Sequence, residues 1–310
     1  MSKPSDRKTV GFVGTGRMGR RMALHVINAG FPVRVFDIVS AAMADLAARG
    51  ARACASAREV AESSDVVITI LPDPAAVESV MLGEAGIASG IRPGAVVVEM
   101  STIAPALSRR LGLAIERHGA HYLDCPISGG VPGAEQGTLT LMVGGHSEVL
   151  ERCRDVLEPM AGSIYHLGGI GAGLTAKLIN QLLTMTQTVL VVEALAMGAR
   201  AGLNLRTLHE LIGKSSGRSW CWEHRIRRIL EKNEEAWVTV DICHKDLGLA
   251  KALGEELGVP LFVATEAYQV LQMAKAMQLG DQDVSALGAL YERMLGSEMR
   301  ATVGTEAAKP

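Results

Sequence analysis

The sequence has few of the cysteine and histidine patterns that mark disulfide-rich or metal-binding proteins. Its 310 residues contain five cysteines, which are scattered and include no Cys-x-x-Cys pair. This pattern argues against a disulfide framework or a zinc site and favours a reducing interior. His118 and His121 lack a third partner of ligand type, so we expect no metal.

Strong net charge, long apolar runs and an apolar leader are also missing. The formal net charge of −2 provides no positive electrostatic field that would attract nucleic acid or an anionic membrane. The longest apolar stretches reach only about half of the ~20 residues that a membrane span needs. Residues 1–8 are polar and run directly into a strand pattern. These absences predict a cytoplasmic protein that binds neither membrane nor nucleic acid.

Strand and helix patterns alternate over the first half of the chain. The length predicts about two domains, and this alternation is typical of an α/β domain with a doubly wound parallel sheet. The predicted strands are Thr9–Val13, Val33–Phe36, Val66–Leu71, Ala95–Glu99, His121–Leu123, Leu139–Val143 and Ile164–Leu167. We therefore assign residues 1–167 to the first domain.

Helical patterns fill the second half. Apolar positions recur at helical spacing over about 174–201, roughly twice the usual helix length, as expected of a helix that bridges two domains. Further predicted helices are Arg206–Ile212, Trp220–Lys232, Val240–Leu257, Phe262–Gln278 and Val284–Leu295. They predict an all-helical domain over residues 168–310. We expect this domain to contact substrate and to pair copies of the chain in a homodimer or homotetramer.

A Gly-x-Gly-x-x-Gly motif lies between the first predicted strand and the first helix. It consists of Gly14, Thr15, Gly16, Arg17, Met18 and Gly19. In this context the first glycine makes a tight turn, the second lets the backbone approach a pyrophosphate, and the third allows close helix packing. Glycines also occur in purely structural turns, but the flanking strand and helix favour a Rossmann-type dinucleotide-binding domain.

Asp37 ends the second predicted strand, about twenty residues after the glycine motif. A carboxylate at this place accepts hydrogen bonds from an adenosine ribose and repels a 2′-phosphate. Ile38, Val39 and Ser40 provide no arginine that would reverse this choice. The alternative is an aspartate that only caps the strand. We predict that the cofactor is NAD.

Lys177 follows a glycine-rich segment at the start of the long predicted helix, in or near its first turn. The positive end of the helix dipole disfavours an ammonium there, and partial burial would do the same. Both effects favour a lysine that acts as a general base. Asn180 and Gln181 share its face at i+3 and i+4 and can hold a hydroxyl or the amine. A solvated surface lysine is the alternative.

Ser128, Gly129 and Gly130 lie in a glycine-rich segment after the strand that ends near Leu123. No helical pattern follows this segment, so we expect a loop. Exposed backbone N–H groups and one hydroxyl would form an anion nest suited to a carboxylate. Glycines needed only for a turn are the alternative.

Together these segments resemble the β-hydroxyacid dehydrogenase family, which includes 3-hydroxyisobutyrate dehydrogenase and tartronate semialdehyde reductase. The resemblance extends from Val10 to about Arg293 and rests on ordered motifs. These are GFVGTGRMG, ILPDP, EMSTI, DCPISGG, GAGLTAKLINQ and DICHKDLGLA. It implies a hydroxy-acid substrate that is oxidised by hydride transfer to NAD.

The resemblance also implies a role for each matched residue. Leu71 and Pro72 would flank the cofactor, and Thr102 would lie near its nicotinamide end. Ser128, Gly129 and Gly130 would bind the substrate carboxylate, and Lys177 would transfer the proton. Lys245 would close over cofactor and substrate. The alternative interpretation is that Lys245 only forms an intrahelical ion pair with Asp241 at i−4.

One position departs from the family pattern. Many members carry two asparagines where this chain has Asn180 and Gln181, so the substrate pocket should differ. The segment around Gln181, with Ser219–Trp220 and Asp241–Ala250, looks more similar to the L-threonate dehydrogenase branch. An NADH-dependent reductase of a semialdehyde and a non-catalytic nucleotide sensor are the alternative functions. Lys177 argues against the sensor. A decarboxylating enzyme similar to 6-phosphogluconate dehydrogenase is a further alternative, but such enzymes have a considerably longer chain, which argues against it.

Overall fold

The computed structural model describes residues 7–231, 235–296 and 298–299. The chain divides into two compact units, Met1–Leu178 and Ile179–Pro310. The division falls within one long helix, α8 (Ala172–Arg200). The domain boundary at 167–168 stays a prediction, because compactness alone does not show which segments fold independently.

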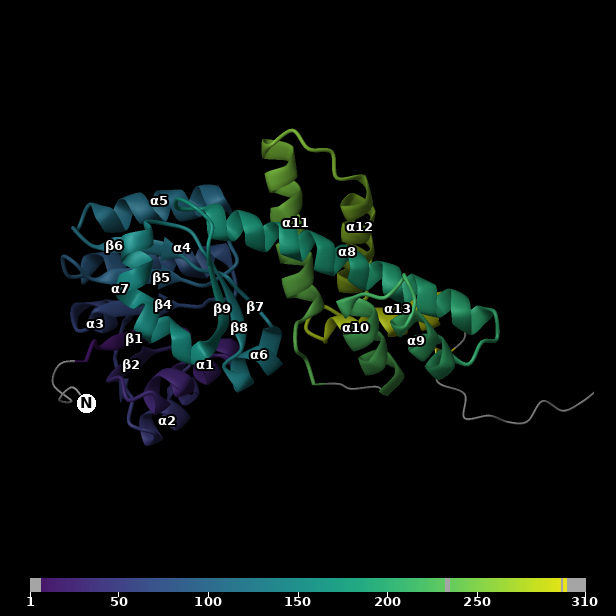
Figure 1. Cartoon of the computed structure of the whole chain (residues 1–310), viewed down its shortest axis with the longest axis horizontal. Coiled ribbons are helices and arrows are strands. Elements are labelled where there is room, and N and C mark those ends of the chain that lie inside the picture. Colours follow the sequence, from purple (N-terminus) through teal and green to yellow (C-terminus); the bar gives the residue numbers. More distant parts are fainter. Residues whose placement is uncertain (1–6, 232–234, 297, 300–310) are drawn as a thin grey trace, which may run out of the picture. The chain divides into compact units, whose positions relative to one another are not determined.

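The first unit contains a six-stranded parallel sheet (Figure 1). The strand order β3-β2-β1-β4-β5-β6 is that of a doubly wound Rossmann-type sheet, which confirms the predicted fold class. The strands are β1 (Val10–Val13), β2 (Val33–Phe36), β3 (Arg52–Ala53), β4 (Val66–Thr69), β5 (Val96–Glu99) and β6 (His121–Asp124).

Both faces of this sheet are buried, which is why its strands are almost continuously apolar. Along β4, Val66 and Ile68 belong to one core cluster, whereas Val67 belongs to the cluster on the other face. The first unit also contains the following helices. They are α1 (Arg17–Asn28), α2 (Ala41–Ala48), α3 (Ala57–Glu62), α4 (Pro74–Leu82), α5 (Pro105–Glu116), α6 (Gly130–Gln136) and α7 (Ser147–Leu157).

A second, three-stranded sheet corrects the expectation that all predicted strands join one sheet. It contains β7 (Ile127–Ser128), β8 (Leu139–Val143) and β9 (Ala161–His166), in that order. The β7–β8 pair is antiparallel and the β8–β9 pair is parallel. Strands β3 and β7 were missed because two residues are too few to show an alternating pattern. The two sheets meet at a bridge between Asp124 and Gly144.

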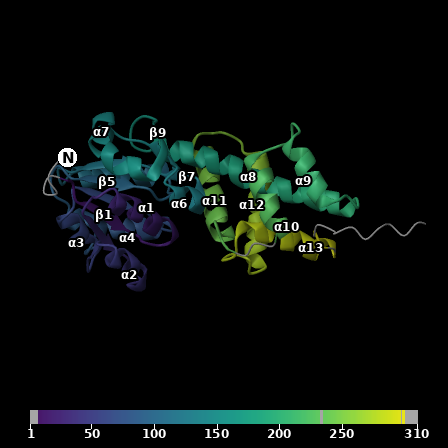
Figure 2. The same cartoon turned by 60° about the horizontal axis from the view of Figure 1, so that its bottom comes forward.

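The second unit is helical, as predicted. Its helices gather around the C-terminal part of α8 (Figures 1 and 2). They are α9 (Leu205–Gly213), α10 (Trp220–Glu231), α11 (Val240–Glu256), α12 (Phe262–Ala276) and α13 (Leu287–Leu295). The core that they share includes Val192, Ile226, Leu247, Leu271 and Leu290. The predicted end of the second of these helices, Lys232, lies outside the described residues.

Helix α8 has 29 residues and, by length and composition, is apolar enough to cross a membrane. This corrects the expectation that no apolar stretch is long enough. The core helix of a soluble protein meets the same criterion, and 44% of its most apolar stretch is buried inside the protein. The criterion is therefore weak evidence for a membrane span.

Candidate active site

The glycine turn joins β1 to α1, and its three glycines have different surroundings. Gly14 has a φ of +92°, and a Cβ on it would lie 2.3 Å from the Ile70 carbonyl oxygen. A Cβ on Gly19 would lie 2.0 Å from the Gly14 carbonyl oxygen, whereas one on Gly16 would meet no heavy atom within 4 Å. Gly14 and Gly19 thus allow close backbone packing, and Gly16 leaves open space beside the helix start.

The N-terminus of α1 is suited to an anion. Its N-cap residue is Gly16, no side chain caps it, and its first turn carries no acidic residue. Its free N–H groups and the positive end of the helix dipole favour a pyrophosphate. Met18, in the first turn, is partly buried and packs against the core. The turn therefore fits a dinucleotide.

The Asp37 carboxylate ties the end of β2 to the glycine turn. Its Oδ2 accepts hydrogen bonds from the Thr15 backbone N–H at 2.7 Å and from the Thr15 hydroxyl at 3.2 Å. Its Oδ1 accepts one from the Val39 backbone N–H at 2.9 Å. A carboxylate accepts about four hydrogen bonds, so capacity remains for a ribose hydroxyl. The neighbouring Ile38 side chain is 89% exposed and apolar.

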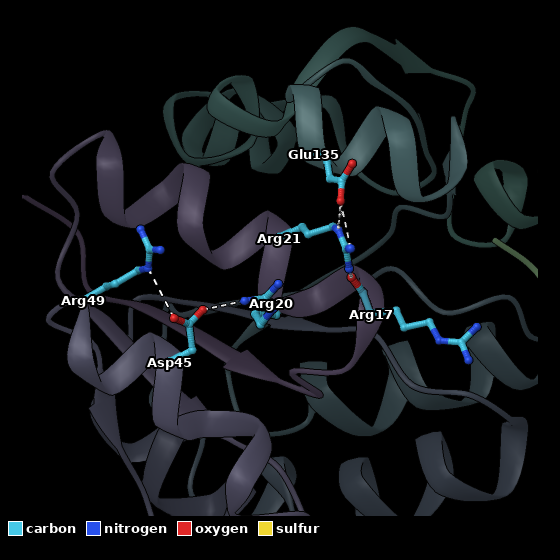
Figure 3. A network of polar contacts seen from close by, with 6 residues as sticks. All are labelled: Arg17, Arg20, Arg21, Asp45, Arg49 and Glu135. Atoms are coloured by element: carbon cyan, nitrogen blue, oxygen red, sulfur yellow. Dashed lines mark hydrogen bonds and ion pairs between the residues drawn. The ribbon is translucent and has the colours of Figure 1, made fainter. Parts of the chain in front are cut away.

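Arg17, Arg20 and Arg21 lie at the start of α1, and the last two are engaged by carboxylates (Figure 3). Arg20 pairs with Asp45 of α2 at 2.6 Å, and Arg21 pairs with Glu135 of α6 at 2.8 Å. Figure 3 shows Arg17 extending away from both ion pairs. The Arg21 pair also links the nucleotide helix α1 to α6, the helix that follows Ser128.

The segments after β4 and β5 meet beside the glycine turn. A Cβ on Gly14 would lie 3.0 Å from Leu71 Cδ2, so Leu71 lies against this turn. The Leu71 backbone N–H donates to the Ser101 hydroxyl at 2.8 Å. Thr102 follows Ser101, and Pro72 follows Leu71. The predicted cofactor-flanking residues therefore come from adjacent parallel strands.

Glu99 and Ser101 lie next to the candidate site, and sequence reasoning missed their contacts. Glu99 is fully buried at the end of β5, where its carboxylate accepts from the Thr69 hydroxyl and the Ser101 backbone N–H, both at 2.6 Å. The available signal was an acidic residue closing an otherwise apolar strand. Glu99 organises the segment that carries Thr102.

Ser128, Gly129 and Gly130 lie differently from the loop that was expected. Ser128 ends β7, and α6 begins at Gly130 directly behind it. The expectation of no helix there is wrong, because Gly133 and Pro132 weaken the helical pattern of a segment only two turns long. Gly129 and Gly130 are exposed and have φ values of +125° and +59°. Their N–H groups at the start of α6 still suit a carboxylate.

Lys177 is buried, with an exposure of 7%. Because α8 begins at Ala172, Lys177 lies in the second turn rather than the first. The helix dipole acts mainly over the first turn, so its effect on Lys177 is smaller than expected from the sequence. Lys177 belongs to the same compact unit as the glycine turn, Asp37 and Ser128.

Asp124 anchors the start of α8. Its Oδ1 accepts from the Gly171 backbone N–H at 2.7 Å, and its Oδ2 accepts from the Leu174 backbone N–H at 2.8 Å. Burial raises the pKa of the Asp124 carboxyl, and these N–H groups oppose the rise. Asp124 was missed because its partners lie far away in the sequence.

The second unit contains the remaining predicted site residues in one polar chain. Asn180 Nδ2 donates to Gln181 Oε1 at 3.1 Å, and Gln181 Nε2 donates to Asp246 Oδ2 at 2.5 Å. Lys245 pairs with Asp246 at 3.1 Å, whereas Asp241 pairs with Lys275 at 3.0 Å. Asp246 is buried and was missed, although it directly follows Lys245 in the sequence.

A glycine turn suited to a dinucleotide, a carboxylate just after β2 and a buried lysine are the features expected of a nicotinamide-dependent dehydrogenase. Residues 9–168 match the NAD-binding domain of 6-phosphogluconate dehydrogenase. Residues 171–291 match the NAD-binding domain of NADP-dependent 3-hydroxyisobutyrate dehydrogenase. The chain belongs to the β-hydroxyacid dehydrogenase family, and it is an NAD-dependent hydroxyacid dehydrogenase.

Individual relatives agree with this assignment. The chain is 40% identical to 2-(hydroxymethyl)glutarate dehydrogenase of Eubacterium barkeri, over 93% of this chain and 96% of that protein. It is 34% identical to L-threonate dehydrogenase of Cupriavidus necator, over 90% and 95%. A solved 3-hydroxyisobutyrate dehydrogenase from Salmonella typhimurium is 34% identical, with a TM-score of 0.84 over 90% of this chain and 98% of that one.

Alanine at Gly16 and at Gly19 should separate ligand space from packing. Gly16→Ala should change the free energy of unfolding by less than about 0.5 kcal/mol but weaken NAD binding by about tenfold or more. Gly19→Ala should lower that free energy by about 1–3 kcal/mol, because its methyl would overlap the Gly14 carbonyl. Urea unfolding measures the free energy of unfolding of each variant, and NAD titration measures its affinity for NAD. Unchanged NAD affinity of the Gly16 variant would contradict this placement of the pyrophosphate.

Removing the Asp37 carboxylate should weaken the preference for NAD over NADP. A carboxylate close to a 2′-phosphate is repulsive by at least ~1 kcal/mol even in water. We expect kcat/KM to favour NAD by about tenfold or more, and Asp37→Ala to narrow this ratio. Asp155→Ala, which removes an exposed carboxylate paired with Lys8, is the control. Equal use of both cofactors by the unmodified protein would overturn the assignment.

Proposed function

We propose that this dehydrogenase oxidises a small β-hydroxy acid, with Lys177 as its general acid–base. The observation that carries the proposal is the burial of Lys177 in the same compact unit as the dinucleotide turn. A buried amine that can exist in its neutral form is a competent base near neutral pH.

Oxidation removes a proton from the substrate hydroxyl and a hydride from the same carbon. The neutral Lys177 amine accepts the proton and becomes an ammonium. Ser128 and the N–H groups of Gly129 and Gly130 hold the carboxylate, so the reacting carbon is oriented. NAD supplies the hydride acceptor when it is bound. In the reverse direction, the Lys177 ammonium returns its proton to the developing alkoxide.

The names of several relatives indicate a substrate class. 2-(Hydroxymethyl)glutarate, L-serine and 3-hydroxyisobutyrate each carry a hydroxymethyl group on the carbon next to a carboxylate. Relatives named for these three substrates are 40%, 35% and 36% identical to this chain. A Mycobacterium tuberculosis 3-hydroxyisobutyrate dehydrogenase solved with L-serine is 32% identical, with a TM-score of 0.82. We therefore place the substrate in this class.

NADH production across a panel of hydroxy acids tests the substrate class. The panel contains 2-(hydroxymethyl)glutarate, L-serine, 3-hydroxyisobutyrate, L-threonate and D-glycerate. A higher kcat/KM for L-threonate than for the first three would favour the L-threonate branch instead. Activity only with a semialdehyde and NADH would favour a reductase, such as one for tartronate semialdehyde.

Lys245 and the amides of α8 are proposed to act on the bound cofactor and substrate. The resemblance to the family assigns them this role, and the buried Asp246 contacts both Lys245 and Gln181. We also propose a cytoplasmic location, because all five cysteines are free and buried, as expected of a protein from a reducing compartment.

We further propose that α8 pairs with the same helix of a second copy of the chain. Leu183, Leu190 and Met197 are exposed on α8 at seven-residue spacing, so they form one apolar stripe. Such a stripe can meet its own copy across a two-fold axis, because the same surface serves both subunits.

Replacing Lys177 should abolish most turnover without loss of cofactor binding. Lys177→Ala should lower kcat by about 10²–10⁴-fold, the usual contribution of positioned proton transfer. NAD affinity should stay within about twofold, because the pyrophosphate contacts lie on the glycine turn. Lys177→Arg should not restore activity, since a guanidinium remains protonated. Lys8→Ala is the control, and near-normal turnover of Lys177→Ala would refute the mechanism.

A charge within the α8 stripe should disrupt assembly. Leu190→Glu should lower the molar mass measured by light scattering toward that of one chain, because a buried unpaired carboxylate disfavours association. The matched control is Leu113→Glu on α5, since Leu113 is 59% exposed and Leu190 is 58% exposed. A monomeric unmodified protein, or equal effects of both variants, would contradict the proposed interface.

A further inference from the structure

Asp124 occupies the junction of the two sheets in the first unit. It ends β6 and directly precedes Cys125–Gly130, the segment that carries the proposed carboxylate-binding residues. Its backbone N–H donates to the Gly144 carbonyl at 3.1 Å, and its carbonyl accepts from the Gly144 N–H at 2.8 Å. The carboxylate is fully buried. Asp124 therefore has a fixed position relative to β7.

The same carboxylate caps a helix from a distance. The first N–H groups of an α-helix have no partner within the helix, and a nearby side chain usually accepts from them. For α8 this acceptor is Asp124, which bonds the Gly171 and Leu174 N–H groups. A negative charge here also complements the helix dipole. The start of α8 is thus bound to the end of β6, in addition to the local bond from the Ala172 N–H to the Gly169 carbonyl.

Three glycines make this approach possible. A Cβ on Gly144 would lie 2.4 Å from Asp124 Oδ1, and one on Gly173 would lie 2.2 Å from the Met142 carbonyl oxygen. Gly171 has a φ of +94°, which L-residues with side chains rarely adopt. The glycine-rich segment before Lys177 therefore serves the contact between α8 and the carboxylate.

We propose that Asp124 is a positioning residue for proton transfer. It fixes Lys177, which lies one turn beyond the capped Leu174, relative to Ser128 and the following glycines. One carboxylate then sets the distance between the group that takes the hydroxyl proton and the groups that hold the substrate. This inference rests on the proposed role of Lys177.

A double-mutant cycle tests the proposal with purified full-length protein. Asp124→Asn keeps the size of the side chain but replaces one acceptor by a donor that faces an N–H group. We expect kcat to fall by about tenfold or more in the Lys177 background and by no more than about twofold in the Lys177→Ala background. The Kd for NAD should stay within about twofold, because the glycine turn is not altered.

The readouts separate positioning from general destabilisation. Turnover is normalised to the concentration of folded sites, measured by NAD titration. Ser56→Ala, which removes the side-chain cap of α3, should lower the urea midpoint and leave kcat unchanged. If Asp124→Asn does not fold, Asp124→Ala takes its place, because it removes both acceptors without adding a donor.

Two results would overturn the inference, and they differ in what else they exclude. If Asp124→Asn lowers kcat by the same factor in both backgrounds, or in neither, then Asp124 does not act through Lys177. The proposed function would stand in that case. Near-normal turnover of Lys177→Ala would overturn the proposed function together with this inference.

Discussion

The parallel pairing of β1, β2, β4, β5 and β6 is the constraint on which the site in the first unit depends. Parallel strands end at the same edge of a sheet, and ligands of doubly wound folds bind beyond that edge. The glycine turn follows β1, Asp37 follows β2 and Leu71 follows β4. These residues lie close together because each directly follows a strand of the same parallel sheet.

Buried carboxylates hold this edge together. Glu99 and Asp124 end adjacent strands, and polar donors satisfy both carboxylates. Glu99 accepts from the Ser101 N–H and from the Thr69 hydroxyl of the neighbouring strand β4, whereas Asp124 accepts from N–H groups at the start of α8. A buried charge is tolerated only where such donors satisfy it. Burial also raises the pKa of the Tyr122 hydroxyl and the Cys125 thiol nearby, so both stay neutral.

The sequence was sufficient for five of the six strands of the parallel sheet, the glycine turn and the helical second half, because each has a local pattern. Gly14, Gly16 and Gly19 could be assigned separate functions, and their different surroundings agree with those functions. Contacts between distant segments left no such signal. Asp124 lies 47 residues from Gly171, and Gln181 lies 65 residues from Asp246. Short elements such as β7 and α6 were hidden for another reason, since too few residues repeat.

Gln181 shows how such a distant contact changes the meaning of a substitution. From the sequence, its extra methylene relative to asparagine enlarges the reach of a substrate ligand. In the structure, that reach brings Nε2 to the buried Asp246 carboxylate on α11. Asp246 in turn pairs with Lys245, so one buried carboxylate contacts both Gln181 and Lys245. A shorter amide would leave a buried carboxylate oxygen without this donor, which is unfavourable. The departure from the family pattern thus alters how α8 contacts α11.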